Sequence, residues 1–174
     1  MKQQLEIEFK TLINKEQFDK ITALYRPLSF SKQHNYYYKS SFCDQSFRVR
    51  VKENKKVFTL KENSGNQIME YEKEFTGFFY EDNEISSTLQ KFNILPPFLL
   101  IGELITYRAI VENDLAQLCF DINCYNGLID YEIEYEMKKD HEGLNMFKEI
   151  LSKADIEFMP SYASKYVRCI STKE

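Results

Sequence analysis

Carboxylates recur at every second position in several stretches of this 174-residue chain, a spacing that could hold a metal ion. Glu6 and Glu8 form one such pair near the start of the chain, and Glu132 and Glu134 form another near its end. Side chains two residues apart on a β-strand point to the same face and lie roughly 6.5–7 Å apart along it. Such carboxylates can converge on a hard cation, because hard cations prefer oxygen ligands.

Basic residues follow the same two-residue spacing in other stretches. Arginine suits bidentate contacts with phosphate, and lysine acts as a point charge. Apart from Lys10, which follows Glu6 and Glu8 on the same predicted face, these bases fall in other stretches than the paired acids, an arrangement that suits a metal-bound phosphate ligand. The basic positions are Arg48, Arg50 and Lys52 in one stretch, Lys61 after Thr59 in the next, and Arg108 in a later one.

The opposite faces of these stretches are apolar. Leu5, Ile7 and Phe9 alternate with the first acids, and Phe47 and Val49 alternate with the first bases. An antiparallel sheet can bury one face and leave the other in water. Charged residues at alternate positions of a single strand are therefore also expected on an ordinary solvent-exposed face. The segregation of acids and bases by strand favours a ligand site over mixed surface charge.

Eight stretches have the alternation and the aromatic and β-branched content of strands. Asn126-Gly127 between two of them is a strong hairpin signal, and short turns imply antiparallel neighbours. The expected strands are 2–10, 33–40, 46–53, 56–62, 67–76, 103–112, 115–124 and 128–138, and the other short turns are Glu53-Asn54-Lys55, Asn63-Ser64-Gly65-Asn66 and Asn113-Asp114.

Four helices are expected between and after the strands. Asn14 can cap a helix that starts at Lys15, and Gln17 completes a capping box. Pro160 precedes the last helix. The other expected helices are 81–93, 142–154 and 161–171.

These elements predict an α+β fold in which the charged faces turn inward. If the helices cover the apolar faces from outside, the strands can form a closed eight-stranded antiparallel β-barrel, or tunnel, with helices packed outside. A barrel of about eight strands has room for one slender ligand. Inward charges need a ligand and water to compensate them, so such an interior is a functional site. We expect a single domain over residues 1–174.

Composition excludes several classes of protein. The net charge of −4 argues against a generic nucleic-acid binder. The longest apolar run, Ile94–Ile101, is too short to span a bilayer, and the polar N-terminus is not a signal peptide. We therefore expect a cytoplasmic protein with no nucleic-acid or membrane partner. None of the four cysteines forms a CxxC pair, which predicts free thiols at Cys43, Cys119, Cys124 and Cys169.

Other catalytic constellations are missing from the sequence. It has no GxxxxGK[ST] loop and no Ser-His-Asp set in a known sequence context. His34 and His141 form no metal-binding pair and are expected at the surface or at a strand edge.

An ordered set of motifs resembles the CYTH domains, also called triphosphate tunnel metalloenzymes. Glu6-Ile7-Glu8-Phe9-Lys10 resembles their ExExK signature. The set spans nearly the whole chain, and its acidic run is most similar to the small stand-alone branch of Gram-positive bacteria. The further matches, in the family's order, are Phe47-Arg48-Val49-Arg50, Thr59-Leu60-Lys61, Arg108, Asp121, the run from Asp130 to Glu136, and Ser164-Lys165-Tyr166.

The resemblance implies a tunnel of eight antiparallel strands and metal-dependent hydrolysis of triphosphates with Mg²⁺ or Mn²⁺. The expected partner is a small-molecule triphosphate. The same fold hosts class IV adenylate cyclases, so the fold alone does not decide the reaction.

Roles for individual residues follow from the resemblance and from the charge pattern. Lys10, Asp121 and Glu132 are the expected catalytic residues, with Asp121 and Glu132 placing a second metal ion or the attacking water. The roles of Glu70, Glu72 and Glu74 stay open. The expected phosphate-binding residues are Lys10, Arg48, Arg50, Lys61, Arg108 and, from the last helix, Lys165. The expected ligands of the first metal ion are Glu6, Glu8 and Glu134, and Asp121 and Glu132 complete the set of expected metal ligands.

Several functions compete at this stage. An inorganic triphosphatase leads, followed by a class IV-type adenylate cyclase and a thiamine triphosphatase. The chain has no tryptophan to stack on thiamine, as the animal enzyme has, although a tyrosine or phenylalanine could substitute. A module that binds polyphosphate or nucleotides without cutting them is the alternative from another class. A structural barrel with charged outer faces is the simplest reading.

Overall fold

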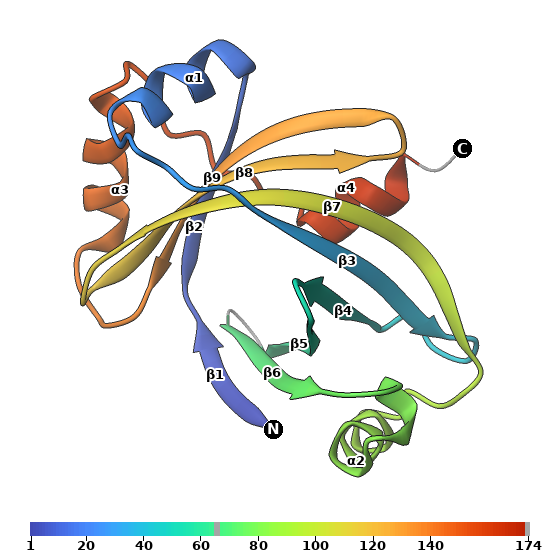
Figure 1. Cartoon of the computed structure of the whole chain (residues 1–174). Coiled ribbons are helices and arrows are strands. Elements are labelled where there is room, and N and C mark those ends of the chain that lie inside the picture. The colour runs from blue at the N-terminus through green and yellow to red at the C-terminus, as the bar shows by residue number, and fades with distance from the viewer. Residues whose placement is uncertain (65–66, 173–174) are drawn as a thin grey trace. The chain divides into compact units, whose positions relative to one another are not determined.

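The computed structural model describes residues 1–64 and 67–172, and these contain nine β-strands, four α-helices and one short 3-10 helix (Figure 1). All described strand pairs are antiparallel, which confirms the α+β class. The strands are β1 (Lys2–Glu6), β2 (Glu8–Ile13), β3 (Ser31–Ser40), β4 (Ser46–Lys52), β5 (Lys55–Ser64), β6 (Gln67–Phe75), β7 (Phe98–Glu112), β8 (Ala116–Tyr125) and β9 (Leu128–Met137), and the helices are α1 (Lys15–Ala23), η1 (Phe79–Glu81), α2 (Asn83–Lys91), α3 (Gly143–Ser152) and α4 (Lys165–Ser171).

The prediction of a closed eight-stranded barrel is wrong. The hydrogen-bonded order β1-β6-β5-β4-β3-β7-β8-β9-β2 has nine members and two ends. The expected first strand is two strands, because β1 pairs with β6 whereas β2 pairs with β9. The chain changes partner at Ile7, whose carbonyl accepts a hydrogen bond from the backbone N–H of Met137.

Most other boundaries lie close to the predicted ones. β7 begins at Phe98, five residues before the expected start, because the apolar run after Pro97 joins the strand. Asn126 and Gly127 both have positive φ, 47° and 76°, as the predicted tight hairpin between β8 and β9 requires. In the turn predicted at 63–66, the last two residues lie outside the described part of the chain.

The chain divides into two compact units, and each is described by itself. The first unit holds Met1–Glu6, Gln33–Leu104 and the described residues after Lys165, and the second holds Ile7–Lys32 and Ile105–Lys165. The prediction of one domain over the whole chain stays a prediction.

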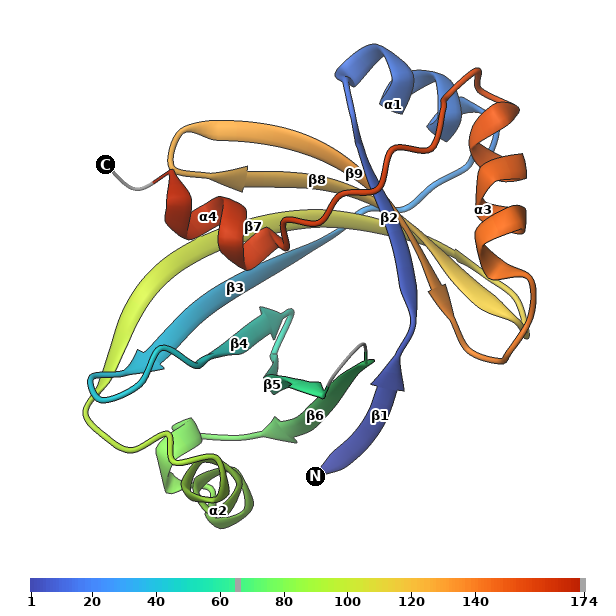
Figure 2. The ribbon, with the colours of Figure 1, turned by 180° about the vertical axis from the view of Figure 1, so that it is seen from behind.

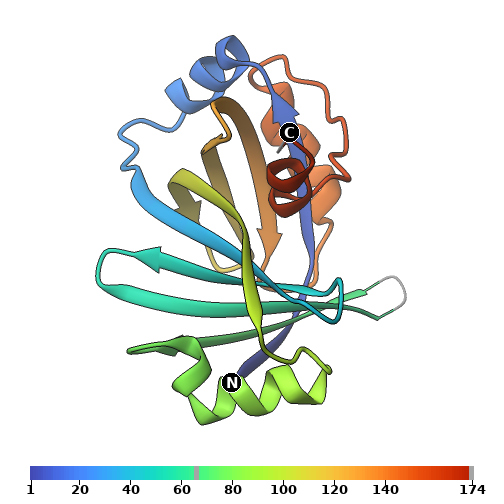
Figure 3. The same ribbon diagram turned by 90° about the vertical axis from the view of Figure 1, so that its right-hand side faces the viewer.

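In the first unit, α2 covers the apolar face of β4, β5 and β6 (Figure 3). Phe47, Phe58 and Leu60 are at most 2% exposed and pack in one cluster with Ile85 and Leu89 of α2. Full burial of such a side chain stabilises a fold by roughly 1.5–3 kcal/mol. The alternating residues of the same strands, which include the predicted basic ones, therefore lie on the opposite face.

Helix α4 belongs to the first unit except for its first residue, Lys165, and within that unit it packs on the first part of β7 (Figure 2). The Cys169 thiol donates a hydrogen bond to the carbonyl of Glu103 at 3.3 Å. A Cβ at Gly102 would lie 3.2 Å from the Cys169 sulfur, so this close approach favours glycine.

In the second unit, α1 and α3 cover the apolar face of the strands (Figure 1). Phe120 of β8 and Ile133 of β9 form a cluster with Phe18 and Phe147, which come from α1 and α3. The predicted capping box of α1 is confirmed, since the Asn14 side chain accepts from the Gln17 N–H at 2.9 Å and the Gln17 side chain accepts from the Asn14 N–H at 3.0 Å.

Two predictions from composition can be compared directly with the structure. All four cysteines are free thiols. None of the helices in the described ranges has the length and apolar character that crossing a membrane requires.

Candidate functional site

Three neighbouring strands of the second unit bring a base and two acids into one row. Arg108 of β7 is the register partner of Asp121 of β8, and Asp121 is the partner of Glu132 of β9. One step along the sheet, Glu134 of β9 is the partner of Lys10 of β2. The period of two places these side chains on the face opposite the core, as the sequence predicted.

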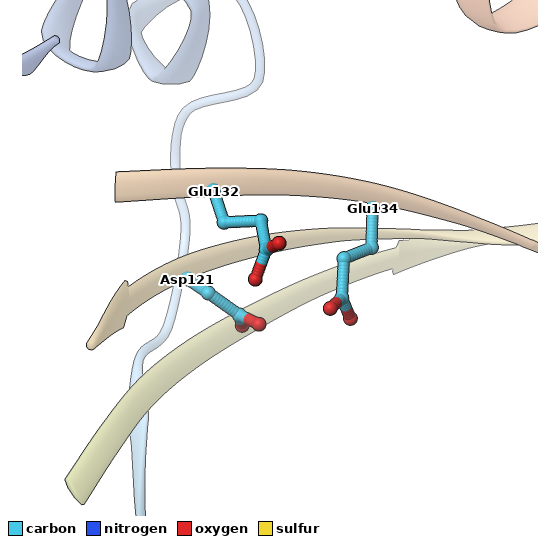
Figure 4. Close-up of side chains that lie close together, drawn as sticks. All are labelled: Asp121, Glu132 and Glu134. Carbon is cyan, nitrogen blue, oxygen red and sulfur yellow. The ribbon is translucent and has the colours of Figure 1, made fainter. Parts of the chain in front are cut away.

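Three carboxylates of this face form a buried cluster, shown as sticks in Figure 4. Asp121 and Glu132 are 0% exposed and Glu134 is 7% exposed. One oxygen from each residue lies within 4.8 Å of the others. We call Asp121, Glu132 and Glu134 the acidic cluster.

Two cations neutralise most of the acidic cluster. Arg108 donates to both Asp121 oxygens, from Nε at 2.7 Å and from Nη2 at 2.5 Å, and Nη2 also contacts Glu134. The Lys165 Nζ lies 2.6 Å from Glu132 Oε2 and 2.9 Å from Asp121 Oδ2, and it also contacts Glu134. Three carboxylates thus face two cations, which leaves one excess negative charge.

Mutual attraction keeps Glu134, Arg108 and Lys165 ionised. Burial acts to raise the pKa of Glu134, but Lys165 and Arg108 outweigh it and hold that pKa well below the ordinary 4.5. Burial acts to lower the pKa of Arg108 and of Lys165, but the carboxylates around them raise both pKa values above their ordinary range. These three groups therefore carry full charge at neutral pH.

Lys10 and Glu8 extend the charged face on β2. The Lys10 Nζ lies 2.5 Å from Glu8 Oε1, and both side chains are mostly buried. The positive charge of Lys10 also helps to lower the pKa of its partner across the strands, Glu134. The Lys10–Glu8 ion pair therefore lies beside the acidic cluster, and Lys10 is electrostatically coupled to Glu134.

In the first unit, Thr59 links the predicted basic residue Arg48 to an acid. Arg48 Nη2 donates to the Thr59 hydroxyl at 3.0 Å, and that hydroxyl donates to Glu72 Oε1 at 3.1 Å. Arg48 Nη2 also lies 4.0 Å from Glu70 Oε1. Within the described residues, the buried Nε of Arg48 has no hydrogen-bond partner, so a donor is available to an incoming acceptor.

The other two predicted basic residues of the first unit are also held in place. Arg50 Nε donates to Asn35 Oδ1 at 3.0 Å. Lys61 Nζ lies 2.6 Å from Glu6 Oε2 and 3.7 Å from Glu70 Oε1. Glu6, predicted as a metal ligand, is therefore an ion-pair partner of Lys61 in this structure.

The three acids of β6, whose roles the sequence left open, differ in their contacts. Glu70 and Glu72 lie against Arg48, and Glu70 also lies against Lys61. Glu74 pairs with the exposed Lys55 at 3.3 Å. Glu70 and Glu72 therefore orient basic side chains, and Glu74 forms a surface ion pair.

The predicted site residues fall into two groups, one in each unit. Glu6 belongs to the first unit, so the predicted set of metal ligands is not gathered within one unit, and the roles assigned to single residues stay predictions. Lys10, Glu8, Arg108, Asp121, Glu132, Glu134 and Lys165 lie in the second unit, whereas Glu6, Arg48, Arg50 and Lys61 lie in the first.

A polar chain beside the acidic cluster, buried at Thr106 and Asn123 and partly buried at Asp130, was not predicted from the sequence. The Thr106 hydroxyl donates to Asn123 Oδ1 at 2.8 Å, and Asn123 Nδ2 donates to Asp130 Oδ1 at 2.9 Å. The signal was available, because these residues stand two positions from Arg108, Asp121 and Glu132 and so share their face. All three belong to the second unit.

A computational family model for the CYTH domain matches residues 4–169. The strands, the charged faces and this match define one class of protein, and the chain belongs to the CYTH domain family.

Individual relatives agree with this assignment. The chain is 30% identical over 170 residues to the Bacillus subtilis protein "Putative triphosphatase YjbK", which covers 90% of each chain. It is similar to a Bacillus halodurans crystal structure described as a "putative adenylate cyclase", with 28% identity, a TM-score of 0.84 and coverage of 97% of this chain and 98% of that one. A Hippeastrum protein, a "putative adenylyl cyclase" described as having a dominant triphosphatase activity, shares the fold at 21% identity, a TM-score of 0.77 and 97% coverage of both chains.

Proposed function

We propose that this protein is a divalent-metal-dependent hydrolase of small triphosphates and that inorganic triphosphate is its leading substrate. The observation that carries the proposal is the buried acidic cluster with Arg108 and Lys165 against it. The name of the Bacillus subtilis relative, a triphosphatase, supports the same reaction. In this reaction a water oxygen bonds to the terminal phosphorus and the P–O bond to the neighbouring phosphate breaks. The products are orthophosphate and the shortened chain, which is pyrophosphate when inorganic triphosphate is the substrate.

The acidic cluster fits a hard divalent cation such as Mg²⁺ or Mn²⁺. Its candidate donors are carboxylate oxygens only, which these ions prefer, and they lie close together. Asp121, Glu132 and Glu134 would hold the ion, with Glu6 and Glu8 as further proposed ligands. A bound ion would supply positive charge to phosphate oxygens and lower the pKa of a water molecule.

The basic residues are proposed to bind the phosphate chain. In phosphoryl transfer, charge spreads over the equatorial oxygens of the transferred group, so catalysis is mainly positioning and electrostatic stabilisation. Arginine guanidinium groups can bind two oxygens at once, whereas lysines supply single point charges. The proposed phosphate-binding residues are Arg108, Lys165 and Lys10 in the second unit and Arg48, Arg50 and Lys61 in the first.

Asp121 and Glu132 are proposed to position the attacking water. Both are carboxylates, which accept hydrogen bonds from water, and both are excluded from bulk solvent. Lys10 is proposed to act on the reacting phosphate, since it lies on the same face and across from Glu134.

Adenylate cyclisation is the second candidate, favoured by the likeness to the Bacillus halodurans structure. A cyclase converts ATP into cyclic AMP and releases pyrophosphate, whereas a hydrolase releases orthophosphate. Analysis of the products from ATP therefore separates the two reactions.

A phosphate-release screen tests the proposal. Inorganic triphosphate, thiamine triphosphate, ATP and GTP are each incubated with the protein and Mg²⁺ or Mn²⁺, and Glu134→Gln serves as the matched control. We expect metal-dependent orthophosphate release, fastest with inorganic triphosphate and lost in the variant. Tight triphosphate binding by calorimetry without turnover of any substrate would instead indicate a binding module and overturn the proposal.

A further inference from the structure

The ammonium group of Lys165 lies among the oxygens of the acidic cluster. It contacts Glu132 Oε2 at 2.6 Å, Asp121 Oδ2 at 2.9 Å and the Oε1 of Glu134. These are the same three residues whose oxygens lie close enough to share one metal ion. Lys165 therefore already supplies a cation to the proposed metal ligands.

A divalent ion and this ammonium group cannot share the three carboxylates at low energetic cost. Each oxygen that contacts Lys165 would have to turn toward the ion, and two cations a few ångströms apart inside a protein repel each other strongly. Replacing the ammonium by a divalent ion would balance the one excess negative charge of the cluster. Both arguments favour exchange over joint occupancy.

Lys165 is better suited than Arg108 to leave the cluster. Arg108 is held by two parallel hydrogen bonds to Asp121 and comes from the interior of β7. Lys165 is the first residue of α4 and carries a point charge on a flexible four-carbon stem. The lysine can therefore turn away by rotation of its flexible stem, whereas Arg108 would have to break two parallel bonds to one carboxylate.

We propose that Lys165 is an internal counter-ion that fills the acidic cluster in the metal-free protein and leaves when the metal ion enters. The inference rests on the proposed function, because it takes the cluster as the metal site. The displaced ammonium group loses three carboxylate partners and becomes available to a phosphate group of the substrate. Binding of the metal ion then frees Lys165 for the triphosphate, so each ligand raises the affinity for the other. This coupling adds to any direct contact between the metal ion and the triphosphate.

Manganese titration of the substrate-free protein tests the exchange without any activity measurement. Lys165→Met removes the competing charge and keeps a chain of similar size, so Mn²⁺ should bind at least about tenfold more tightly than in the wild type. Lys10→Met is the matched control, because it removes one positive charge beside the same cluster and leaves the Lys165 ammonium group in contact with the three carboxylates. A gain in the Lys165 variant no larger than in the Lys10 variant, or weaker binding, would overturn the inference.

Hydrogen exchange provides a second measurement in the unmodified protein. Saturating Mn²⁺ should speed amide exchange in the last turn of α4 in the wild type, because its N–H groups bond to carbonyls of the first turn, whose anchor is released. The same ion should leave this exchange unchanged in Lys165→Met, and Lys165→Gln replaces that variant if it does not fold. Unchanged exchange in the wild type with Mn²⁺ bound would also overturn the inference. Absence of Mn²⁺ binding to the wild type would instead count against the proposed function.

Discussion

Arg108 of β7 and Asp121 of β8 face each other and are joined by two parallel hydrogen bonds of 2.7 and 2.5 Å. A bidentate pair fixes the plane of both groups. Arg108 Nη2 also donates a hydrogen bond to Glu134. One arginine therefore sets the orientation of two members of the acidic cluster. Its planar group has no equivalent in lysine.

Arg108→Lys should keep the fold but lose most of the activity. The variant retains the positive charge, so the buried carboxylates stay compensated, but it cannot hold Asp121 in a fixed plane. We expect kcat/KM for triphosphate to fall by about 100-fold, or roughly 2.7 kcal/mol of transition-state stabilisation. Phosphate-release kinetics measure this change.

The charge itself is tested by Arg108→Gln. This change leaves Asp121 and Glu134 with less compensation, so the free energy of unfolding should drop by about 3–5 kcal/mol in urea titrations. If Arg108→Lys loses as much stability as Arg108→Gln, the planar pairing rather than the charge stabilises the fold.

Glu134→Gln should abolish metal-dependent turnover, because it removes a ligand from the acidic cluster. Glu6→Gln tests the predicted role of a residue that pairs with Lys61 in this structure. If Glu6 is a metal ligand, its variant loses turnover and weakens Mn²⁺ binding measured by calorimetry. If it only orients Lys61, Mn²⁺ affinity stays unchanged and the KM for triphosphate rises. Near-normal rates in both variants would contradict the proposed metal site.

The charged faces could be predicted from the sequence because strand geometry is strictly periodic. Once Arg108 and Asp121 are assigned to strands, the period of two decides which neighbours share their face. The same rule would have added Asn123 and Thr106, which are buried and hydrogen-bonded to each other. Local pattern therefore contains most of the information about this face.

The change of strand partner at Ile7 could not be predicted. Residues 2–13 alternate almost without interruption, and only long-range pairing with β6 and then β9 divides them into two strands. The start of α4 at Lys165, rather than near residue 161, is likewise decided by distant contacts, since Ser161 N–H bonds to the carbonyl of Lys10. Pairings between distant segments leave no periodic trace in a single sequence.

Glu134 should make the stability of the protein depend on pH in the acid range. Its pKa lies well below 4.5 in the folded protein and returns to about 4.5 on unfolding. The carboxylate therefore stabilises the fold fully above about pH 4.5, and this contribution is lost as the pH falls through the folded pKa. The difference in unfolding free energy between wild type and Glu134→Gln should shrink accordingly in urea titrations at successively lower pH. The same change at the exposed Glu149 is the control for a surface carboxylate and should alter the unfolding free energy only slightly.

The four thiols should react at very different rates in the native protein. Cys119 and Cys169 are 0% exposed, and burial is the main cause that raises the pKa of Cys119 to about 12. Because the thiolate is the reactive form, iodoacetamide at about pH 8 should modify the partly exposed Cys43 and leave Cys119 and Cys169 unmodified. Mass spectrometry of digests measures each site, and urea should make all four reactive. Rapid native labelling of Cys119 would contradict its position in the sheet.

Thr59→Val should weaken triphosphate binding through Arg48. The Thr59 hydroxyl accepts from Arg48 and donates to Glu72, and it is buried, so valine leaves both partners without this bridge. We expect a loss of about 1–2 kcal/mol in the free energy of unfolding and a KM for triphosphate raised by about three- to tenfold. Thr59→Ser keeps the hydroxyl and should stay close to the wild type in both measurements. An unchanged KM in the valine variant would show that Arg48 is positioned without Thr59, whereas equal losses in the serine variant would assign the effect to packing of the methyl group.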